Sequence, residues 1–151
     1  MMDINDIKHH INNKSRLIGV DMGSKRVGLS ISDENRKIAT PLKTVNYENT
    51  QILADELKKI ANENNVHAII FGNPKNMDGT EGSSSQSVKD KVKLISEKIQ
   101  IPIFLWDERL STVGAFNLSS ELDVNVTKRV KNIDKNAAAF ILQGDLDFLN
   151  N

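Results

Sequence analysis

Acidic residues at the ends of two apolar segments are the groups in this sequence best suited to chemistry. Asp21 closes the segment that begins at Arg16, and a glycine turn follows it. Asp107 and Glu108 come directly after the apolar segment 101–106. Carboxylate oxygens are the ligands that Mg²⁺ and other hard cations prefer in proteins. A divalent-cation site is therefore one interpretation of these acids, and ordinary turn or strand-end positions are the other.

The neighbouring acids Asp107 and Glu108 pose a question of geometry. Successive side chains of a strand point to opposite faces of the sheet, so the two acids share a face only if the strand has ended. The carboxyl ends of parallel strands are where α/β sheets bind their ligands. The sequence leaves open which of the two faces such a site, and Arg109 offers either one a local ion-pair partner.

A third acid, Asp134, precedes a segment whose apolar residues recur at helical spacing. We expect a helix over 134–149 with Asp134 at its N-cap position, and capping alone would account for this residue. The small residues 137–139 would also let the helix lie close to the sheet. That packing would bring Asp134 towards a metal site.

Basic side chains accompany the acidic positions and could contact a phosphate backbone. Arginine in particular suits bidentate contacts with phosphate. The formal net charge is zero, which argues against a protein that binds nucleic acid through its overall charge but allows a local basic groove. The candidate nucleic-acid-binding residues are Lys25, Arg26, Arg109, Lys128, Arg129 and Lys131.

The spacing of apolar residues predicts an α/β fold. Short turns between the first three strands indicate an antiparallel meander, and the later strands alternate with helices, as in parallel crossovers. This order matches the RNase H-like fold, a five-stranded mixed sheet of order 3-2-1-4-5 flanked by helices. The expected strands are 16–21, 26–32, 37–45, 67–72 and 101–106, and the expected helices are 3–13, 49–64, one marked by apolar residues from Val88 to Ile99, 112–122 and 134–149.

Composition limits the remaining possibilities. A chain of 151 residues fits one domain, and the absence of cysteine excludes disulfides, thiolate metal sites and thiol catalysis. The three histidines are too few and too scattered for a zinc site. No apolar run approaches the ~20 residues of a membrane span, and the acidic start of the chain is unlike a signal peptide. We therefore expect a cytoplasmic protein.

Several segments together resemble the YqgF family, also called RuvX, of pre-16S rRNA nucleases and Holliday-junction-resolvase-like proteins. The resemblance runs from about Arg16 to Leu149 and is carried by the glycine turn after Asp21 and by the segments 76–82, 107–112 and 133–138. We expect an RNase H-like nuclease domain over 16–151 and an N-terminal helical extension over 1–15, which lies outside the resemblance. The family usually has leucine where Asn73 and Lys75 stand, so the loop after the fourth strand is more polar than expected.

The resemblance implies metal-dependent cleavage of nucleic-acid phosphodiesters and a role in maturing the 5′ end of pre-16S rRNA. The family's acids correspond to Asp21, Glu108 and Asp134, as both catalytic residues and metal ligands. They would hold one or two Mg²⁺ or Mn²⁺ ions, one activating water and the other stabilising the leaving oxygen. In the expected strand order Glu108 lies two strands from Asp21, roughly 9–10 Å between backbones, so we expect weak metal binding without nucleic acid.

Three alternatives remain. A Holliday-junction resolvase acting on branched DNA stays within the nuclease interpretation; resolvases usually work as symmetric dimers, and the sequence allows a monomer or a homodimer. A non-catalytic RNA-binding or ribosome-assembly factor would keep the basic residues without needing the acids. An actin-like ATPase or sugar kinase also begins with a strand, an acid and a glycine turn, but such proteins need two domains of this kind to enclose ATP.

Overall fold

The computed structural model describes residues 15–23, 25–73, 82–107 and 126–150, and of residues 84 and 126–135 it describes the backbone alone. The helices expected over 3–13 and 112–122 lie outside the described residues, as does the expected N-terminal extension apart from Ser15. The described elements, in chain order, are β1 (Arg16–Met22), β2 (Arg26–Ser32), β3 (Ala39–Asn46), α1 (Thr50–Asn64), β4 (Val66–Asn73), α2 (Ser83–Ser96), β5 (Ile103–Asp107) and α4 (Val126–Leu149).

The five predicted strands form one sheet of order β3-β2-β1-β4-β5, as the RNase H-like interpretation requires. β2 pairs antiparallel with β1 and β3, whereas β4 pairs parallel with β1 and β5. β1, β3, β4 and β5 therefore run in one direction and end at the same edge of the sheet. We call this edge, marked by Met22, Asn46, Asn73 and Asp107, the carboxyl edge.

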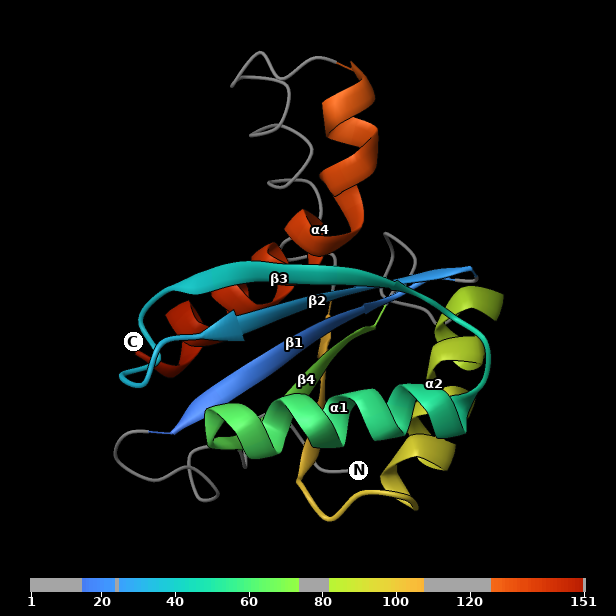
Figure 1. Cartoon of the computed structure of the whole chain (residues 1–151), viewed down its shortest axis with the longest axis horizontal. Helices are drawn as coiled ribbons and strands as arrows, with labels where there is room; N and C mark the ends of the chain where they lie inside the picture. The colour runs from blue at the N-terminus through green and yellow to red at the C-terminus, as the bar shows by residue number, and fades with distance from the viewer. Residues whose placement is uncertain (1–14, 24, 74–81, 108–125, 151) are drawn as a thin grey trace.

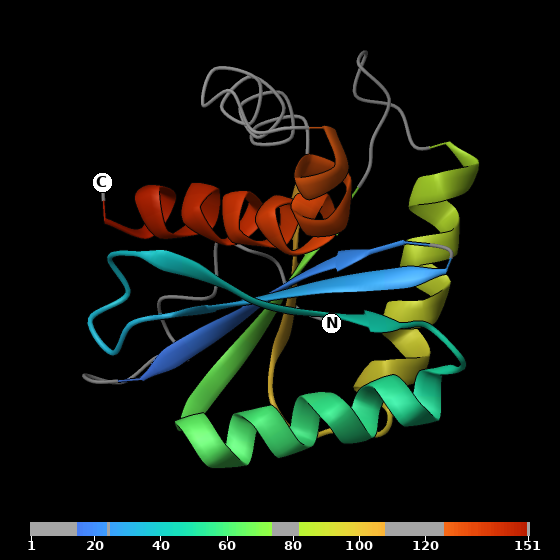
Figure 2. The same cartoon turned by 45° about the horizontal axis from the view of Figure 1, so that its top comes forward.

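Helices cover both faces of the sheet. α1 and α2 pack on one face, and α4 lies across the other (Figure 1, Figure 2). Strand alternation divides the core between these faces. Ile18 and Val20 of β1 belong to the cluster beneath α1 and α2, whereas Leu17 belongs to the cluster beneath α4. The α4 cluster also contains Ala68, Ile70, Phe104, Trp106, Ile141, Leu142 and Leu146.

α1 confirms the helix predicted over 49–64. Capping residues at both ends explain where this helix begins and ends. The side chain of Asn49 accepts a hydrogen bond from the backbone N–H of Ile52 at 2.9 Å. At the other end Asn65 adopts the left-handed conformation, with φ of 55°, and donates its N–H to the carbonyl of Ala61. The stripe between the caps is buried against the sheet and consists of Leu53, Ala54, Leu57, Ile60 and Ala61.

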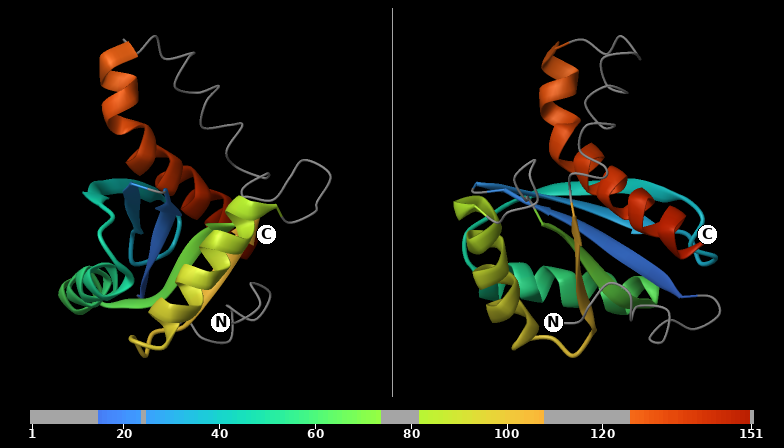
Figure 3. Two further views of the ribbon diagram at one scale, coloured as in Figure 1. Left: turned by 90° about the vertical axis from the view of Figure 1, so that its right-hand side faces the viewer. Right: turned by 180° about the vertical axis from the view of Figure 1, so that it is seen from behind.

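Two helices begin earlier than predicted. α2 begins at Ser83, five residues before the Val88 that marked it in the sequence. α4 begins at Val126 rather than at 134, so the prediction that Asp134 caps this helix is wrong and Asp134 lies inside it. The first turns of α4 stand away from the sheet, as both views of Figure 3 show.

None of the helices in the described part of the chain combines the length and the apolar character that crossing a bilayer requires.

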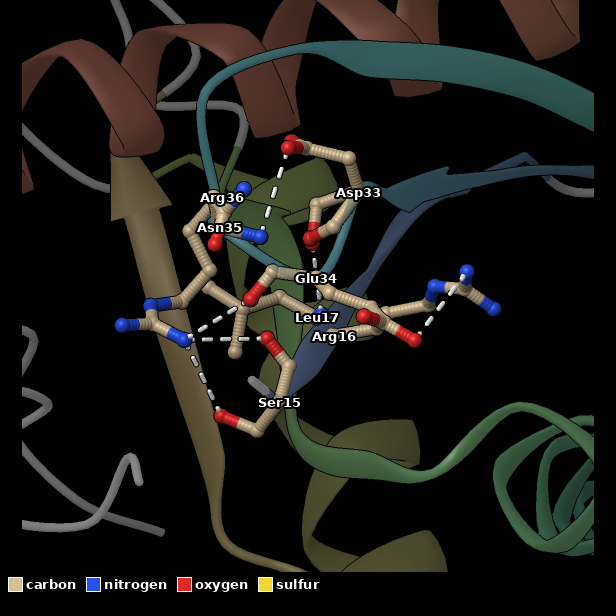
Figure 4. A network of polar contacts seen from close by, with 8 residues as sticks. Ser15, Arg16, Leu17, Asp33, Glu34, Asn35 and Arg36 are labelled. Atoms are coloured by element: carbon tan, nitrogen blue, oxygen red, sulfur yellow. Dashed lines mark hydrogen bonds and ion pairs between the residues drawn. The ribbon is translucent and has the colours of Figure 1, made fainter. Parts of the chain in front are cut away.

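A polar network fixes the turn between β2 and β3 at the edge opposite the carboxyl edge. The carboxylate of Asp33 accepts hydrogen bonds from three backbone N–H groups within residues 35–38. Arg36, whose φ is 57°, donates from its guanidinium to the carbonyl of Ser15 at 3.1 Å (Figure 4). Desolvation raises the pKa of Asp33, but the backbone hydrogen bonds lower it more, so its pKa lies below the ordinary value. This cluster is structural, since it ties the turn to the start of β1.

Candidate active site at the carboxyl edge

Asp21 lies on the central strand of the sheet, at the carboxyl edge. It is half-buried and pairs in register with Gly28 of β2. Leu17, four residues earlier on β1, packs beneath α4, so alternation places Asp21 on the same face. The sequence prediction that a carboxylate stands at this position on the first strand is confirmed.

α4 approaches β1 in backbone contact two residues before Asp21. A Cβ atom on Gly19 would lie 2.7 Å from the Cβ of Leu142 and 2.9 Å from the carbonyl oxygen of Ala138. The hydroxyl of Ser30, on β2, donates a 2.8 Å hydrogen bond to the same carbonyl. Only a residue without a side chain fits at position 19. Ala138, whose carbonyl makes this contact, is one of the small residues 137–139 that were expected to let the helix lie close to the sheet.

The direction of α4 follows from its later contacts. The side chain of Gln143 accepts a hydrogen bond from the backbone N–H of Ala39, and the side chain of Asn150 donates to the carbonyl of Arg36. Both partners lie towards the edge opposite the carboxyl edge. From Ala138 towards its start, α4 therefore runs to the carboxyl edge, and position 134 is one helical turn along that path.

Asp107 ends β5 on the other face of the sheet. Phe104 and Trp106 belong to the cluster beneath α4, whereas Ile103 belongs to the cluster beneath α1 and α2 and Leu105 packs against it. Alternation gives Asp107 the orientation of Ile103 and Leu105, opposite to that of Asp21. Trp106 is 6% exposed and belongs to the core beneath α4.

The structure places some of the predicted site residues and leaves others undescribed. Asp21, Lys25 and Arg26 lie at the carboxyl edge, and both basic residues are exposed. Glu108 and Arg109 are outside the described residues. Asp134, Lys128, Arg129 and Lys131 are within α4, where only the backbone is described. Among the described residues, no group of three or more His, Cys, Asp or Glu could hold a metal ion.

A buried polar pair at the end of β4 was not predicted from the sequence. The side-chain carbonyl of Asn73, which is 4% exposed, accepts a 2.5 Å hydrogen bond from the hydroxyl of Ser85 in the first turn of α2. This contact accounts for a polar residue where leucine was expected, because the amide oxygen has a fixed partner. A polar residue ending an apolar strand, followed by serines, is the signal that could have identified it.

An aromatic residue at the carboxyl edge was also missed. Tyr47 follows β3, and its backbone N–H donates a 2.8 Å hydrogen bond to the carbonyl of Lys25. The ammonium of Lys91, on α2, lies 4.5 Å from the centre of the Tyr47 ring. Neither side chain belongs to a sequence motif, so only the fold brings them together with Lys25.

On the buried face of α4, Asp145 is an acid with no hydrogen-bond partner among the described residues. Its side chain is fully buried. Burial raises its pKa to about 7. The indole N–H of Trp106, which lies against Gly144, is likewise buried and finds no acceptor in the part of the chain that the structure describes. This acid belongs to the core beneath the helix rather than to the carboxyl edge.

The strand order, the mixed pairing and an acid at the end of the central strand define the class of RNase H-like proteins. Known structures agree on the fold. The fowlpox virus resolvase bound to Holliday-junction DNA superposes with a TM-score of 0.54 at 12% identity, over 90% of this chain and 99% of that one. At such identity the likeness concerns the fold alone.

Sequence comparison identifies the particular family. The family model of RuvX, described as Holliday junction resolvase, matches residues 15–148. A relative from Pelagibacter ubique, named "Putative pre-16S rRNA nuclease", is 64% identical over the full length of both chains. A relative of the same name from Methylocella silvestris is 39% identical over 99% of this chain and 92% of its own. The chain belongs to the RuvX family.

Proposed function

We propose that this chain is a metal-dependent endonuclease that hydrolyses nucleic-acid phosphodiesters, with the 5′ end of pre-16S rRNA as its cellular target. The observation that carries the proposal is the position of Asp21, at the carboxyl end of the central strand on the face that α4 covers. Membership of RuvX and the names of the relatives support the same class of reaction. An rRNA substrate also supports a cytoplasmic location.

The other two acids of the proposed site follow from strand and helix geometry. Asp107 points away from the α4 face, so in an extended chain the next residue, Glu108, would have the orientation of Asp21. Asp134 precedes Ala138 by one helical turn, about 5.4 Å, on the same stripe of α4. That step would bring position 134 from the level of Gly19 towards that of Asp21. We therefore assign Asp21, Glu108 and Asp134 as the catalytic acids, with Asp107 outside the site.

An all-carboxylate donor set fits Mg²⁺ or Mn²⁺, which prefer oxygen ligands. Asp21 would contribute a half-buried carboxylate at the carboxyl edge, and Glu108 and Asp134 would complete the set. A bound cation would supply an activated water and neutralise charge on the phosphate. Lys25 and Arg26 would contact the phosphate from the β1–β2 turn. Arg109 would do so beside Glu108, and Lys128, Arg129 and Lys131 from the first turns of α4.

A cleavage assay tests the proposal directly. An RNA carrying the 5′ leader of 16S rRNA is incubated with wild type and with Asp21→Asn, in Mg²⁺ and in Mn²⁺. Loss of a metal ligand should cost more than the roughly 10–100-fold typical of outer-shell partners, so Asp21→Asn should be nearly inactive. Asp55→Asn, an exposed carboxylate on α1, is the matched control and should cleave as wild type does. Equal cleavage by wild type and Asp21→Asn would refute the assignment.

The description of the RuvX family as a Holliday junction resolvase favours one second candidate, a nuclease for branched DNA. The same two proteins are therefore assayed on a four-way DNA junction. Cleavage of the junction but not of the RNA would select the resolvase function. If wild type binds RNA tightly but cuts neither substrate, the chain is a non-catalytic RNA-binding factor.

A further inference from the structure

Tyr47 and Lys91 stand out because nothing in the proposed cleavage reaction uses them. They come from different elements, the segment after β3 and the middle of α2, and meet as a cation–π pair at 4.5 Å. The backbone hydrogen bond from Tyr47 to Lys25 ties this pair to the β1–β2 turn, on which Asp21 also borders. Arg26 pairs in register with Asn46, the residue before Tyr47. Val27 packs beneath α1 and α2, so alternation turns Arg26 towards the α4 face. Lys25 and Lys91 are therefore the two cations tied to Tyr47.

Lys25 and Lys91 bring two positive charges to the Tyr47 segment on a chain whose net charge is zero. Lys25 is exposed, and Lys91 is partly exposed. The neighbouring acids in the chain are Glu48, beside Tyr47, and Asp90, beside Lys91; the Asp90 carboxylate accepts a hydrogen bond from the side chain of Gln86. We call Lys25, Tyr47 and Lys91 the basic patch.

The ring gives Lys91 a property that an isolated surface lysine lacks. A free lysine samples many rotamers and loses that freedom when it binds. An ammonium held over an aromatic face is already positioned, while its N–H groups can still donate to an acceptor on the open side. A phosphate oxygen is such an acceptor, and each phosphate neutralised releases counterions.

We propose that the basic patch binds the sugar-phosphate backbone of the substrate on the α1–α2 side of the carboxyl edge, with Lys91 positioned by Tyr47. Asp21 faces α4 at the same edge, so a bound strand would cross the edge from the patch to the cleavage site. The inference rests on the proposed function, since it assumes a nucleic-acid substrate, and it adds Lys91 as a binding residue and Tyr47 as a positioning residue.

Binding measured without metal separates this inference from catalysis. Fluorescence anisotropy with a labelled RNA from the 16S leader should show Lys91→Gln binding about 3–10-fold more weakly than wild type. The slope of log affinity against log salt should fall by about one phosphate contact. Lys93→Gln, the same change at an exposed position two residues along α2, should leave both quantities unchanged.

Tyr47 variants test the positioning role. Tyr47→Phe keeps the aromatic face and should bind RNA as wild type does, whereas Tyr47→Leu should weaken binding. Adding Tyr47→Leu to Lys91→Gln should cause little further loss of RNA affinity, because both changes remove the same contact between Lys91 and the phosphate. Melting temperatures are compared so that a purely structural effect, lower stability with unchanged affinity, is recognised and counts against the proposal.

The outcomes separate the two hypotheses. If wild type cleaves and Asp21→Asn does not, but Lys91→Gln and Lys93→Gln bind RNA equally, the basic patch is wrong and the nuclease function stands. If wild type neither binds nor cleaves the RNA or the DNA junction, the proposed function fails and the patch fails with it.

Discussion

At the scale of single residues, the face of the sheet on which an acid lies decides whether the acid can join Asp21 in the proposed site. Asp107 and Glu108 are adjacent in the sequence, yet β5 directs Asp107 towards the α1–α2 face because Phe104 and Trp106 face α4. The sequence raised this ambiguity and could not resolve it, because the answer depends on which face of β5 each helix covers.

This orientation predicts different results for the two acids. Glu108→Gln should reduce cleavage as severely as Asp21→Asn does, since it would remove a ligand on the α4 face. Asp107→Asn should keep most of the activity. Cleavage rates of the two variants on the same RNA decide the point, with thermal melts to establish that both are folded. Strong loss in Asp107→Asn with full activity in Glu108→Gln would reverse the assignment.

At the scale of elements, the interface between β1 and α4 sets the geometry of the proposed site. The strands were predicted to within a few residues, 26–32 from alternation and others from short apolar runs bounded by turns, because strand burial leaves these patterns in the sequence. The start of α4 was missed although Val126, Val130 and Ile133 keep helical spacing, since basic and polar residues separate them. The contact of Gly19 with α4 could not be predicted, because it joins segments far apart in the sequence.

Gly19→Ala tests this interface. Its Cβ would lie 2.4 Å from the Ser30 hydroxyl and under 3 Å from two groups of α4, so the helix must move away from β1. We expect a destabilisation of about 3 kcal/mol, the upper part of the range for overpacking, measured by urea denaturation. Cleavage by the folded fraction should also fall, because Asp134 would move with the helix.

Gly144→Ala is the matched control on the other side of the same interface. Its Cβ would lie 3.1 Å from the Trp106 indole nitrogen, a tight contact offset by the roughly 1 kcal/mol that alanine gains over glycine in a helix. Its stability should stay near that of wild type. If the two variants were equally stable, the close approach of α4 at Gly19 would not be the constraint described.

At the scale of the whole molecule, Asp145 makes stability depend on pH. Its ordinary pKa of 3.8 applies in the unfolded chain, and burial raises the folded value to about 7. Between these values the folded state binds the extra proton, so stability falls as pH rises and is lowest above about pH 7. The full difference has a ceiling of about 4 kcal/mol.

Asp145→Asn removes this charge and should flatten the profile. Thermal unfolding between about pH 5 and pH 8 should show wild type losing stability as pH rises, and the variant losing much less. Asp33, whose pKa is lowered, stays ionised over this window and does not obscure the effect. Asp147→Asn, an exposed position two residues along α4, should follow the wild-type curve. A wild-type melting temperature that rises with pH would contradict the prediction.

The hydrogen bond between Ser30 and Ala138 joins residues 108 positions apart, and this separation has a consequence for synthesis on the ribosome. The strands emerge first, and the apolar side chains of Leu17, Ile70 and Phe104 have no cover on that face until residues 138–146 of α4 are made. Domains fold as units during translation, and exposed apolar sheet surface invites aggregation. The nascent chain would therefore acquire Asp134, a proposed catalytic acid, and the helix that covers this face in one late step. An incomplete chain would lack the proposed nuclease activity.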